Sequence, residues 1–349
     1  MKRKDFFSSS ASCLAAAFLP SLAEFKTGQP QSRGSDPDHL PLIPSYLKKN
    51  DTIGITSPAG YVTLEELQPA VQLMQSWGYQ VKIGETIGKK DYTFGGTDEE
   101  RAGDFQQMLD DRNIKAIMCA RGGYGAVRII DKLKWNKFKT NPKWIIGFSD
   151  ITVFHSHLNK NAGIASIHSK MCNSFPGDWS KAEPVQVETI LSIQKALGGD
   201  RMEYRCDFNE RNRPGTTTGV LVGGNLKTLE SLAASGSDIN TSGKILFVED
   251  TGEYMYSIDR MFWNLKRSGK LSNLKGLIVG GFKVKIDEGD DEFGRTLQDV
   301  VLEKTREYNY PVCFDFPVGH QKNNFALKCG IKHRLEVQRP QCILTEIKS

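Results

Sequence analysis

One serine in this chain is placed for nucleophilic chemistry. Ser149 follows Phe148 and the apolar run 144–147, at what the pattern indicates is the tight exit of a buried strand. A serine hydroxyl becomes a useful nucleophile only where the backbone exposes it and a nearby base takes its proton. A strand-to-helix elbow provides that exposure in α/β hydrolases. The sequence here is Gly-x-Ser-Asp-Ile instead of Gly-x-Ser-x-Gly, so it also fits a serine that only caps the following segment.

A serine hydrolase also needs a base and a carboxylate that orients it. His320 stands in the loop Pro-Val-Gly-His after the strand-like segment 313–316, where an imidazole is exposed for proton transfer. Glu249 and Asp250 directly follow the apolar run 245–248, where an orienting carboxylate would sit, although such a pair is also typical of a turn or a helix cap. The order Ser149, Glu249, His320 is that of α/β hydrolases. For the remaining histidines a packed or solvated role is favoured: His39, His155, His157, His168 and His333.

Acyl transfer further requires N–H donors for the developing oxyanion. The amide of Asp150, one residue past the serine, is the first candidate. The second is the loop 121–125, where Gly122 and Gly123 would let the backbone approach a substrate closely. Phosphate binding is the alternative for this loop. Its Gly-Gly-x-Gly pattern matches neither a Walker A loop nor Gly-x-Gly-x-x-Gly, so nucleotide binding is disfavoured.

Alternating strands and helices must position these residues. Strand patterns at 51–56, 79–83, 116–119 and 144–147 alternate with helix patterns at 64–77, 101–109 and 127–133. This alternation predicts an α/β domain with a parallel sheet covered on both faces. Sites form at the carboxyl ends of such strands, and the loops 57–60, 121–125 and 148–150 all lie there. After a connection, strand patterns at 219–223, 244–248 and 276–280, with helices at 226–234 and 257–268, predict a second domain.

The first residues have the pattern of an export signal. Lys2, Arg3 and Lys4 precede a small apolar stretch that runs to Pro20, and 21–23 offers small residues for cleavage. The Lys-Arg pair before Asp5-Phe6-Phe7 faintly resembles a twin-arginine signal, although lysine replaces the first arginine. The choice between the Sec and the twin-arginine export route therefore stays open. We therefore predict a signal peptide at 1–23, a flexible leader at 24–46, the nucleophile domain at 47–170, a connecting segment at 171–215 and the second domain at 216–340. If the signal assignment is wrong, a cytoplasmic location follows.

Composition excludes several classes of protein. The chain has 349 residues, of which 39% are hydrophobic and 25% charged, with a formal charge of +5 and no dense basic patch, so nucleic-acid binding is not indicated. No apolar run reaches the roughly 18 residues of a membrane span. Past the signal, none of the cysteines has a C-x-x-C spacing typical of zinc or redox sites. Export would permit disulfides, but the sequence does not say which of these residues are close: Cys119, Cys172, Cys206, Cys313, Cys329 and Cys342.

Seven motifs occur in a recognisable order over about residues 48–340. They are Thr-Ser-Pro-Ala-Gly (56–60), Arg-Gly-Gly-Tyr-Gly (121–125), Gly-Phe-Ser-Asp-Ile-Thr (147–152), Gly-Gly-Asn-Leu (223–226), Val-Glu-Asp (248–250), Ile-Asp-Arg-Met (258–261) and Pro-Val-Gly-His (317–320). Together they resemble the LD-carboxypeptidase family, the S66 serine peptidases. The resemblance implies a flavodoxin-like N-terminal domain, a smaller β-rich C-terminal domain, and a triad of Ser149, Glu249 and His320.

The resemblance also implies a reaction. Family members remove the terminal D-alanine from a murein tetrapeptide, and no metal or other cofactor is required. Some relatives are similar to microcin-immunity proteins, which cleave a peptide-nucleotide amide, so this substrate remains an alternative. The other alternative is a catalytically inactive protein that binds wall peptides. The presence of all three triad residues disfavours it. Murein peptide is thus the expected partner, and the oligomeric state stays open between a monomer and a homodimer. Export would place the protein beside intact cell wall, so turnover is as compatible with the sequence as recycling.

Overall fold

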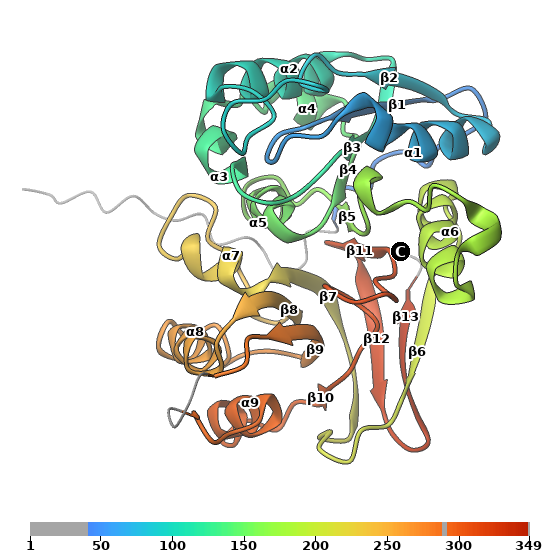
Figure 1. The fold of residues 1–349 in the computed structure, drawn as a ribbon. Helices are drawn as coiled ribbons and strands as arrows, with labels where there is room; N and C mark the ends of the chain where they lie inside the picture. Colours follow the sequence, from blue (N-terminus) through green and yellow to red (C-terminus); the bar gives the residue numbers. More distant parts are fainter. Residues whose placement is uncertain (1–40, 288–291, 348–349) are drawn as a thin grey trace, which may run out of the picture. The chain divides into compact units, whose positions relative to one another are not determined.

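The computed structural model describes residues 41–287 and 292–347, so the expected signal peptide and most of the leader lie outside the described residues. The described part contains two sheets (Figure 1). No helix in it is long and apolar enough to cross a membrane.

The first sheet is largely parallel and has six strands in the order β11-β5-β4-β3-β1-β2. Its members are β1 (Thr52–Thr56), β2 (Gln80–Ile83), β3 (Ile114–Cys119), β4 (Trp144–Gly147), β5 (Ser166–His168) and β11 (Leu327–Cys329). The order 2-1-3-4-5 is that of flavodoxin-like doubly wound folds. Only β11 departs from it: this strand comes from the C-terminal part of the chain and pairs antiparallel with β5.

The helices of this domain are α1 (Leu64–Ser76), α2 (Asp98–Asp110), α3 (Ala126–Ile129), α4 (Asn136–Thr140) and α5 (Thr152–Asn161). Helix α1 shows why they form. Thr63 and Glu66 make a reciprocal capping box at its start. The expected apolar face of Leu67, Val71 and Met74 is buried against the sheet. The predicted alternation of strands and helices is therefore confirmed.

The second sheet is mixed and has seven strands in the order β10-β9-β8-β7-β12-β13-β6. The strands β7 to β10 pair in parallel, whereas β7-β12, β12-β13 and β13-β6 pair antiparallel. The strands are β6 (Glu203–Asp207), β7 (Gly215–Asn225), β8 (Ile245–Glu253), β9 (Gly276–Val284), β10 (Val312–Cys313), β12 (Lys332–Val337) and β13 (Gln341–Glu346). The helices are α7 (Leu226–Ser231), α8 (Met255–Arg267) and α9 (Leu297–Thr305), with α8 and α9 side by side (Figure 1).

The expected boundaries need two corrections. The segment 171–215 is not a plain connection, because it contains α6 (Pro184–Gly198) and strand β6 of the second sheet. The second domain also extends past 340, since β13 lies beyond that point. Prolines and scattered charge suggested a linker there, but Pro184 occupies the first turn of α6, where a proline is well tolerated.

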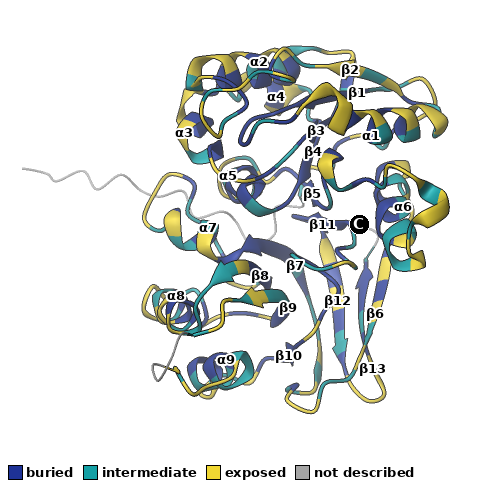
Figure 2. Ribbon diagram, viewed as in Figure 1, coloured by how far each residue is buried: buried dark blue, intermediate teal, exposed yellow. Residues whose placement is uncertain are grey.

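One hydrophobic cluster connects the two sheets. It includes Ile55 and Ile146 of the first sheet together with Phe247 and Leu335 of the second. In Figure 2 the central strands β3 and β4 are largely buried, whereas the edge strand β2 and the outer faces of the helices are exposed. Burying apolar side chains from both sheets in one core fixes the sheets against each other, so loops from both domains can contribute to one site.

Candidate active site

Ser149 lies where β4 ends, as the sequence predicted. Strand β4 ends at Gly147, and a short 3₁₀ helix (Ser149–Ile151) follows at once. The serine has a φ of 61°, a left-handed conformation that costs a non-glycine residue about 1–3 kcal/mol and is concentrated at functional sites. Phe148 is the N-cap of that short helix, and no side-chain cap bond is made there. The capping alternative for Ser149 is thus not what the structure shows.

Glu249 and His320 form a bonded pair. Glu249 is in β8 and wholly buried, whereas His320 is in the loop after β10 and 17% exposed. Its Nδ1 lies 2.6 Å from Glu249 Oε2. Because a carboxylate only accepts, Nδ1–H is the donor, and in the neutral imidazole this leaves the other ring nitrogen, Nε2, as an acceptor.

Gly319 makes this approach possible. Its φ is +103°, and a Cβ placed there would lie 2.4 Å from Glu249 Cβ. The amide of Gly319 donates to Asn324 Oδ1 at 2.7 Å, which fixes the turn. A side chain at position 319 would therefore collide with Glu249.

Opposing effects set the pKa of Glu249. Burial raises it, but the neighbouring imidazoles of His168 and His320 outweigh burial and bring it to about 2. Glu249 is therefore ionised at neutral pH, as the orienting member of a triad must be. Sequence reasoning treated His168 as structural. Its Nε2 lies 3.9 Å from Glu249 Oε1, too far for a hydrogen bond, so its effect is electrostatic.

The Glu-Asp pair divides its roles. Asp250 accepts from Asn225 Nδ2 at 3.0 Å and from the Lys227 amide at 2.9 Å, next to the start of α7. The cap interpretation therefore describes Asp250 but not Glu249. Adjacent residues of a strand point to opposite faces, which separates the two carboxylates.

Phe148 connects the serine turn to the histidine loop. Its ring centroid lies 4.9 Å from that of His320 and 5.8 Å from that of His168. Because Ser149 is the next residue, the contact between Phe148 and His320 brings the end of β4 against the loop after β10. Ser149 and the pair Glu249–His320 thus belong to one region, built from both domains.

Of the two glycines predicted to lie near the reacting groups in the loop 121–125, only Gly122 faces Ser149. A Cβ on Gly122 would be 3.2 Å from Ser149 Cβ and 3.4 Å from its Oγ, so this glycine faces the serine and leaves no room for a side chain between them. Gly123 instead faces Gly60, whose Cα would lie 3.8 Å from an added Cβ. Gly122 is therefore the better placed of the two to act on an oxyanion.

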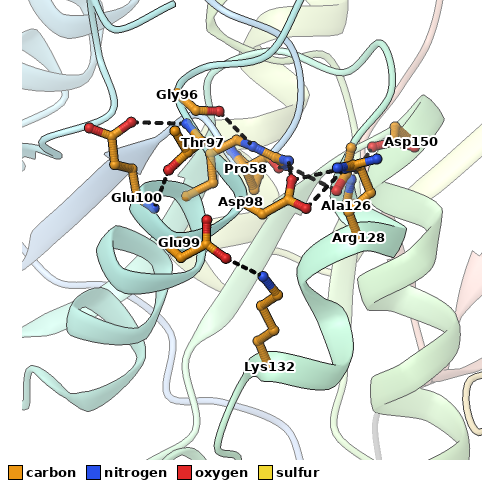
Figure 3. A network of polar contacts seen from close by, with 12 residues as sticks. Pro58, Gly96, Thr97, Asp98, Glu99, Glu100, Ala126, Arg128, Lys132 and Asp150 are labelled. Atoms are coloured by element: carbon orange, nitrogen blue, oxygen red, sulfur yellow. Dashed lines mark hydrogen bonds and ion pairs between the residues drawn. The ribbon is translucent and has the colours of Figure 1, made fainter. Parts of the chain in front are cut away.

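The side chain of Asp150 has a structural task. Its Oδ2 accepts from the Ala126 amide at 2.7 Å, which fastens the glycine loop to the serine turn (Figure 3). Burial raises the pKa of this carboxyl to about 6, although that hydrogen bond and Arg101 act against the rise. The bond holds Gly122 and Ser149 in one arrangement.

A buried arginine holds the neighbouring loops. Arg101 of α2 is fully buried and donates to the carbonyls of Pro58, Gly96 and Gly125, and it pairs with Asp98. A planar guanidinium with five donors suits such multiple bonding. Arg101 was expected at the start of a helix but without a role, because a lone arginine in a helical pattern carries no local signal.

A pocket of ≈ 280 Å³ opens beside His320. Its lining includes the lysines Lys170, Lys283 and Lys322 together with Phe148. Burial and the nearby Lys283 lower the pKa of Lys170, whose ammonium donates to the Gln321 carbonyl at 2.7 Å. These lysines were missed as site residues, because they are far apart in the sequence and belong to no motif.

The other histidines of the described residues have structural partners, as expected. His155 bonds to Ser166 Oγ and to the Gly147 carbonyl, which ties α5 to β4 and β5. His157 bonds to Ser237, and His333 to the Ile331 carbonyl. His39 lies outside the described residues.

A left-handed serine after a parallel strand, with a bonded carboxylate–imidazole pair nearby, defines a serine-hydrolase type of site on a two-domain α/β fold. Comparison with known proteins agrees. Residues 53–169 match the LD-carboxypeptidase N-terminal domain, and residues 218–335 match the LD-carboxypeptidase C-terminal domain. The chain belongs to the LD-carboxypeptidase family, peptidase S66.

Individual relatives show what this chain resembles. It is 30% identical to the probable murein peptide carboxypeptidase of Bacillus subtilis (strain 168), over 86% of this chain and 93% of that protein. It is 25% identical to the microcin C7 self-immunity protein MccF of Escherichia coli, over 88% and 96%. The crystal structure of muramoyltetrapeptide carboxypeptidase from Oxalobacter formigenes superposes with a TM-score of 0.76 at 28% identity, covering 85% of this chain and 99% of that one.

Proposed function

We propose that this protein is a serine carboxypeptidase that hydrolyses the L,D-peptide bond releasing the terminal D-alanine of a murein tetrapeptide. The observation that carries the proposal is the bonded pair Glu249–His320, contacted by the residue preceding Ser149. Membership of the LD-carboxypeptidase family gives the class of bond.

The arrangement suggests how each group would act. His320 Nε2 takes the proton of Ser149 as Oγ attacks the carbonyl carbon on the L side of the bond, which gives a tetrahedral oxyanion. The amides of Asp150 and Gly122 would donate to that oxygen. The imidazolium then protonates the leaving D-alanine amine, and an acyl-serine ester remains. Water, deprotonated by His320, hydrolyses this ester and regenerates Ser149.

Glu249 has two effects in this scheme. Its hydrogen bond keeps the proton on Nδ1, so Nε2 is free to act as the base. Its negative charge stabilises the imidazolium that forms after Ser149 is deprotonated. Since Glu249 is buried, water screens this charge poorly, and the interaction with His320 is correspondingly strong.

The lysine pocket fits an anionic substrate. A murein tetrapeptide ends in a free carboxylate, and Lys170 and Lys283 provide positive charge beside His320. We assign the recognition of that carboxylate to these lysines. We also propose that the protein is exported, on the basis of residues 1–23, and therefore acts on wall peptides outside the cytoplasm.

The test is release of D-alanine from disaccharide-tetrapeptide by the purified protein. Wild type should release it and Ser149→Ala should not, whereas Ser272→Ala, at an exposed serine after α8, should match wild type. No release by wild type, or equal release by Ser149→Ala, would overturn the proposal. Fractionation of cells should yield a shortened chain outside the cytoplasm, and a full-length cytoplasmic chain would contradict export.

Hydrolysis of a peptide-nucleotide amide is the second candidate, favoured by the similarity to MccF over nearly the whole chain. The same preparations should be given a peptidyl nucleotide in parallel. Faster cleavage of that compound than of tetrapeptide, with the same dependence on Ser149, would support this candidate over the first.

A further inference from the structure

Three cysteines meet at a place unrelated to the candidate active site. Cys206 lies on β6, Cys342 on the adjacent strand β13, and Cys313 on β10. Cys206 and Cys342 are direct partners across the β6–β13 pair. Strands β10 and β6 are the two opposite edges of the seven-stranded sheet, so the sheet curls until its edges approach.

Backbone bonds also attach β10 to the connection between β6 and β7. Arg213, in that connection and two residues before β7, exchanges hydrogen bonds with Val312 of β10 at 3.0 and 3.1 Å. The curl therefore does not depend on the cysteines alone. The three thiols lie at this junction, with chain separations that no sequence motif would connect.

The sulfur atoms have the spacing of a metal site. All three Sγ atoms lie within 4.8 Å of one another, and Cys206 Sγ is 3.9 Å from Cys313 Sγ. Sulfurs placed trigonally about an ion at about 2.3 Å would be about 4.0 Å apart by simple geometry. The observed separation is close to that value and well above the roughly 2.05 Å of a disulfide. Among the described residues, these cysteines are the group of three or more His, Cys, Asp or Glu side chains whose ligand atoms lie close enough to hold one metal ion.

A neighbouring amide supports the sulfurs. Asn212 donates from Nδ2 to Cys342 Sγ at 3.2 Å, while its Oδ1 accepts from the Phe314 amide at 2.7 Å. Asn212 is buried, with 8% of its surface exposed. A buried donor directed at a sulfur orients a ligand and stabilises its thiolate form, the usual role of groups surrounding a metal site.

The cluster can be reached from outside. Cys313 and Cys342 are buried, but Cys206 is half-buried and lines a pocket of ≈ 540 Å³. Asp207 and Asp315 also line this pocket, and Arg205 is the basic residue among its lining. Two carboxylates against one guanidinium, which is itself paired with Glu203, favour the approach of a cation.

We propose that Cys206, Cys313 and Cys342 form a three-thiolate binding site for a thiophilic d¹⁰ cation, Cu(I) or Zn(II), which fastens together the two edges of the second sheet. Thiolate ligands select these ions. Three sulfurs alone complete a trigonal Cu(I) site, whereas Zn(II) takes a fourth ligand such as water from the pocket. Binding forms metal–sulfur bonds and releases the thiol protons to solvent, with no change in oxidation state. The proposal does not depend on the proposed function.

The test is metal titration of the full chain, reduced and freed of metal under anaerobic conditions. Zn²⁺ and Cu⁺ are titrated separately against a chromophoric chelator. We expect one equivalent of one or both ions to bind, and we expect Cys206→Ser, Cys313→Ser and Cys342→Ser each to weaken binding by about 100-fold or more. Cys329→Ala, at a buried strand cysteine outside the cluster, should bind like wild type.

Melting curves separate binding from misfolding. The ion should raise the Tm of wild type and of Cys329→Ala but not that of Cys313→Ser, even where the apo proteins melt at similar temperatures. Which ion binds at one equivalent identifies the metal. The site is refuted if neither ion binds stoichiometrically, or if Cys313→Ser binds as wild type does. A mass 2 Da lower in the unreduced protein, with the loss mapped to two of these cysteines, would show a disulfide and overturn the proposal as well.

Discussion

Glu249 and His320 stand 71 residues apart in the chain and share a 2.6 Å hydrogen bond. The acceptor carboxylate is wholly buried, and the donor imidazole reaches the surface. One ring nitrogen therefore faces a permanent negative charge, while the other is free to exchange protons with a substrate. This relationship is the basis of two of the following predictions.

Glu249→Gln should lower kcat by about 10²–10⁴-fold, because an amide neither fixes the tautomer nor stabilises the imidazolium. KM should change little, since Glu249 does not line the pocket. Steady-state D-alanine release measures both constants. Glu253→Gln, which removes a like charge farther along the same strand, should match wild type. Equal kcat in the two variants would remove Glu249 from the mechanism.

Gly319→Ala should separate the pair. The added Cβ would meet Glu249 at 2.4 Å, in addition to left-handed backbone strain of about 1–3 kcal/mol. We expect a loss of activity larger than the loss of stability explains, measured by D-alanine release and urea unfolding of the same preparation. Gly243→Ala is the matched control, because its φ is +71° but its Cβ would meet nothing within 4 Å. If both variants lose activity equally, strain and not the clash is responsible.

Gly122→Ala should reduce kcat/KM by up to about 10-fold, since displacing a reacting group by a full ångström costs about 100-fold and a smaller displacement costs less. Its Cβ would lie 3.2 Å from that of Ser149, which forces the serine or the glycine loop to move. Gly103→Ala, within α2 and facing open space, should keep full activity and gain about 0.4–1 kcal/mol of stability. Undiminished turnover in Gly122→Ala would show that this loop does not contact the reacting groups.

Asp150→Asn should change how stability depends on pH. Burial raises the pKa of Asp150 from 3.8 to about 6. A raised carboxyl pKa contributes stability that is fully present below pH 3.8 and is lost as pH rises through about 6. Wild type therefore loses stability as pH rises and Asp150 ionises, whereas the asparagine of the variant cannot ionise. The free energy of unfolding of the variant minus that of wild type should rise between pH 4 and 7.5, by up to about 3 kcal/mol. Urea unfolding at both pH values measures this. If the difference in unfolding free energy between Asp150→Asn and wild type is the same at both pH values, the shift is contradicted.

Much of the first domain could be predicted because its signals are local. The apolar run ending at Gly147 predicted strand β4, and the periodic spacing of Leu67, Val71 and Met74 predicted the buried face of α1. The segment 171–215 was mistaken for a connection, because prolines and charges also occur at the first turn and outer face of a helix. Strand β11 could not be assigned to the first sheet, since the pairing of Leu327 with His168 and of Cys329 with Ser166 joins distant parts of the chain and leaves no periodic trace in the sequence.

The sequence by itself determined the succession of strands and helices, the place of Ser149 at a strand exit, and the set of motifs that define the family. These depend on the local backbone and on periodic burial. Only the tertiary structure showed that Glu249 bonds to His320 while Asp250 bonds elsewhere, that Gly122 and not Gly123 faces the serine, and that three distant cysteines converge. Such contacts follow from the strand order and the curl of the second sheet, which bring together residues that share no local pattern. Ser149, Glu249 and His320 could each be named from local motifs, whereas the hydrogen bond between the last two is a property of the tertiary structure alone.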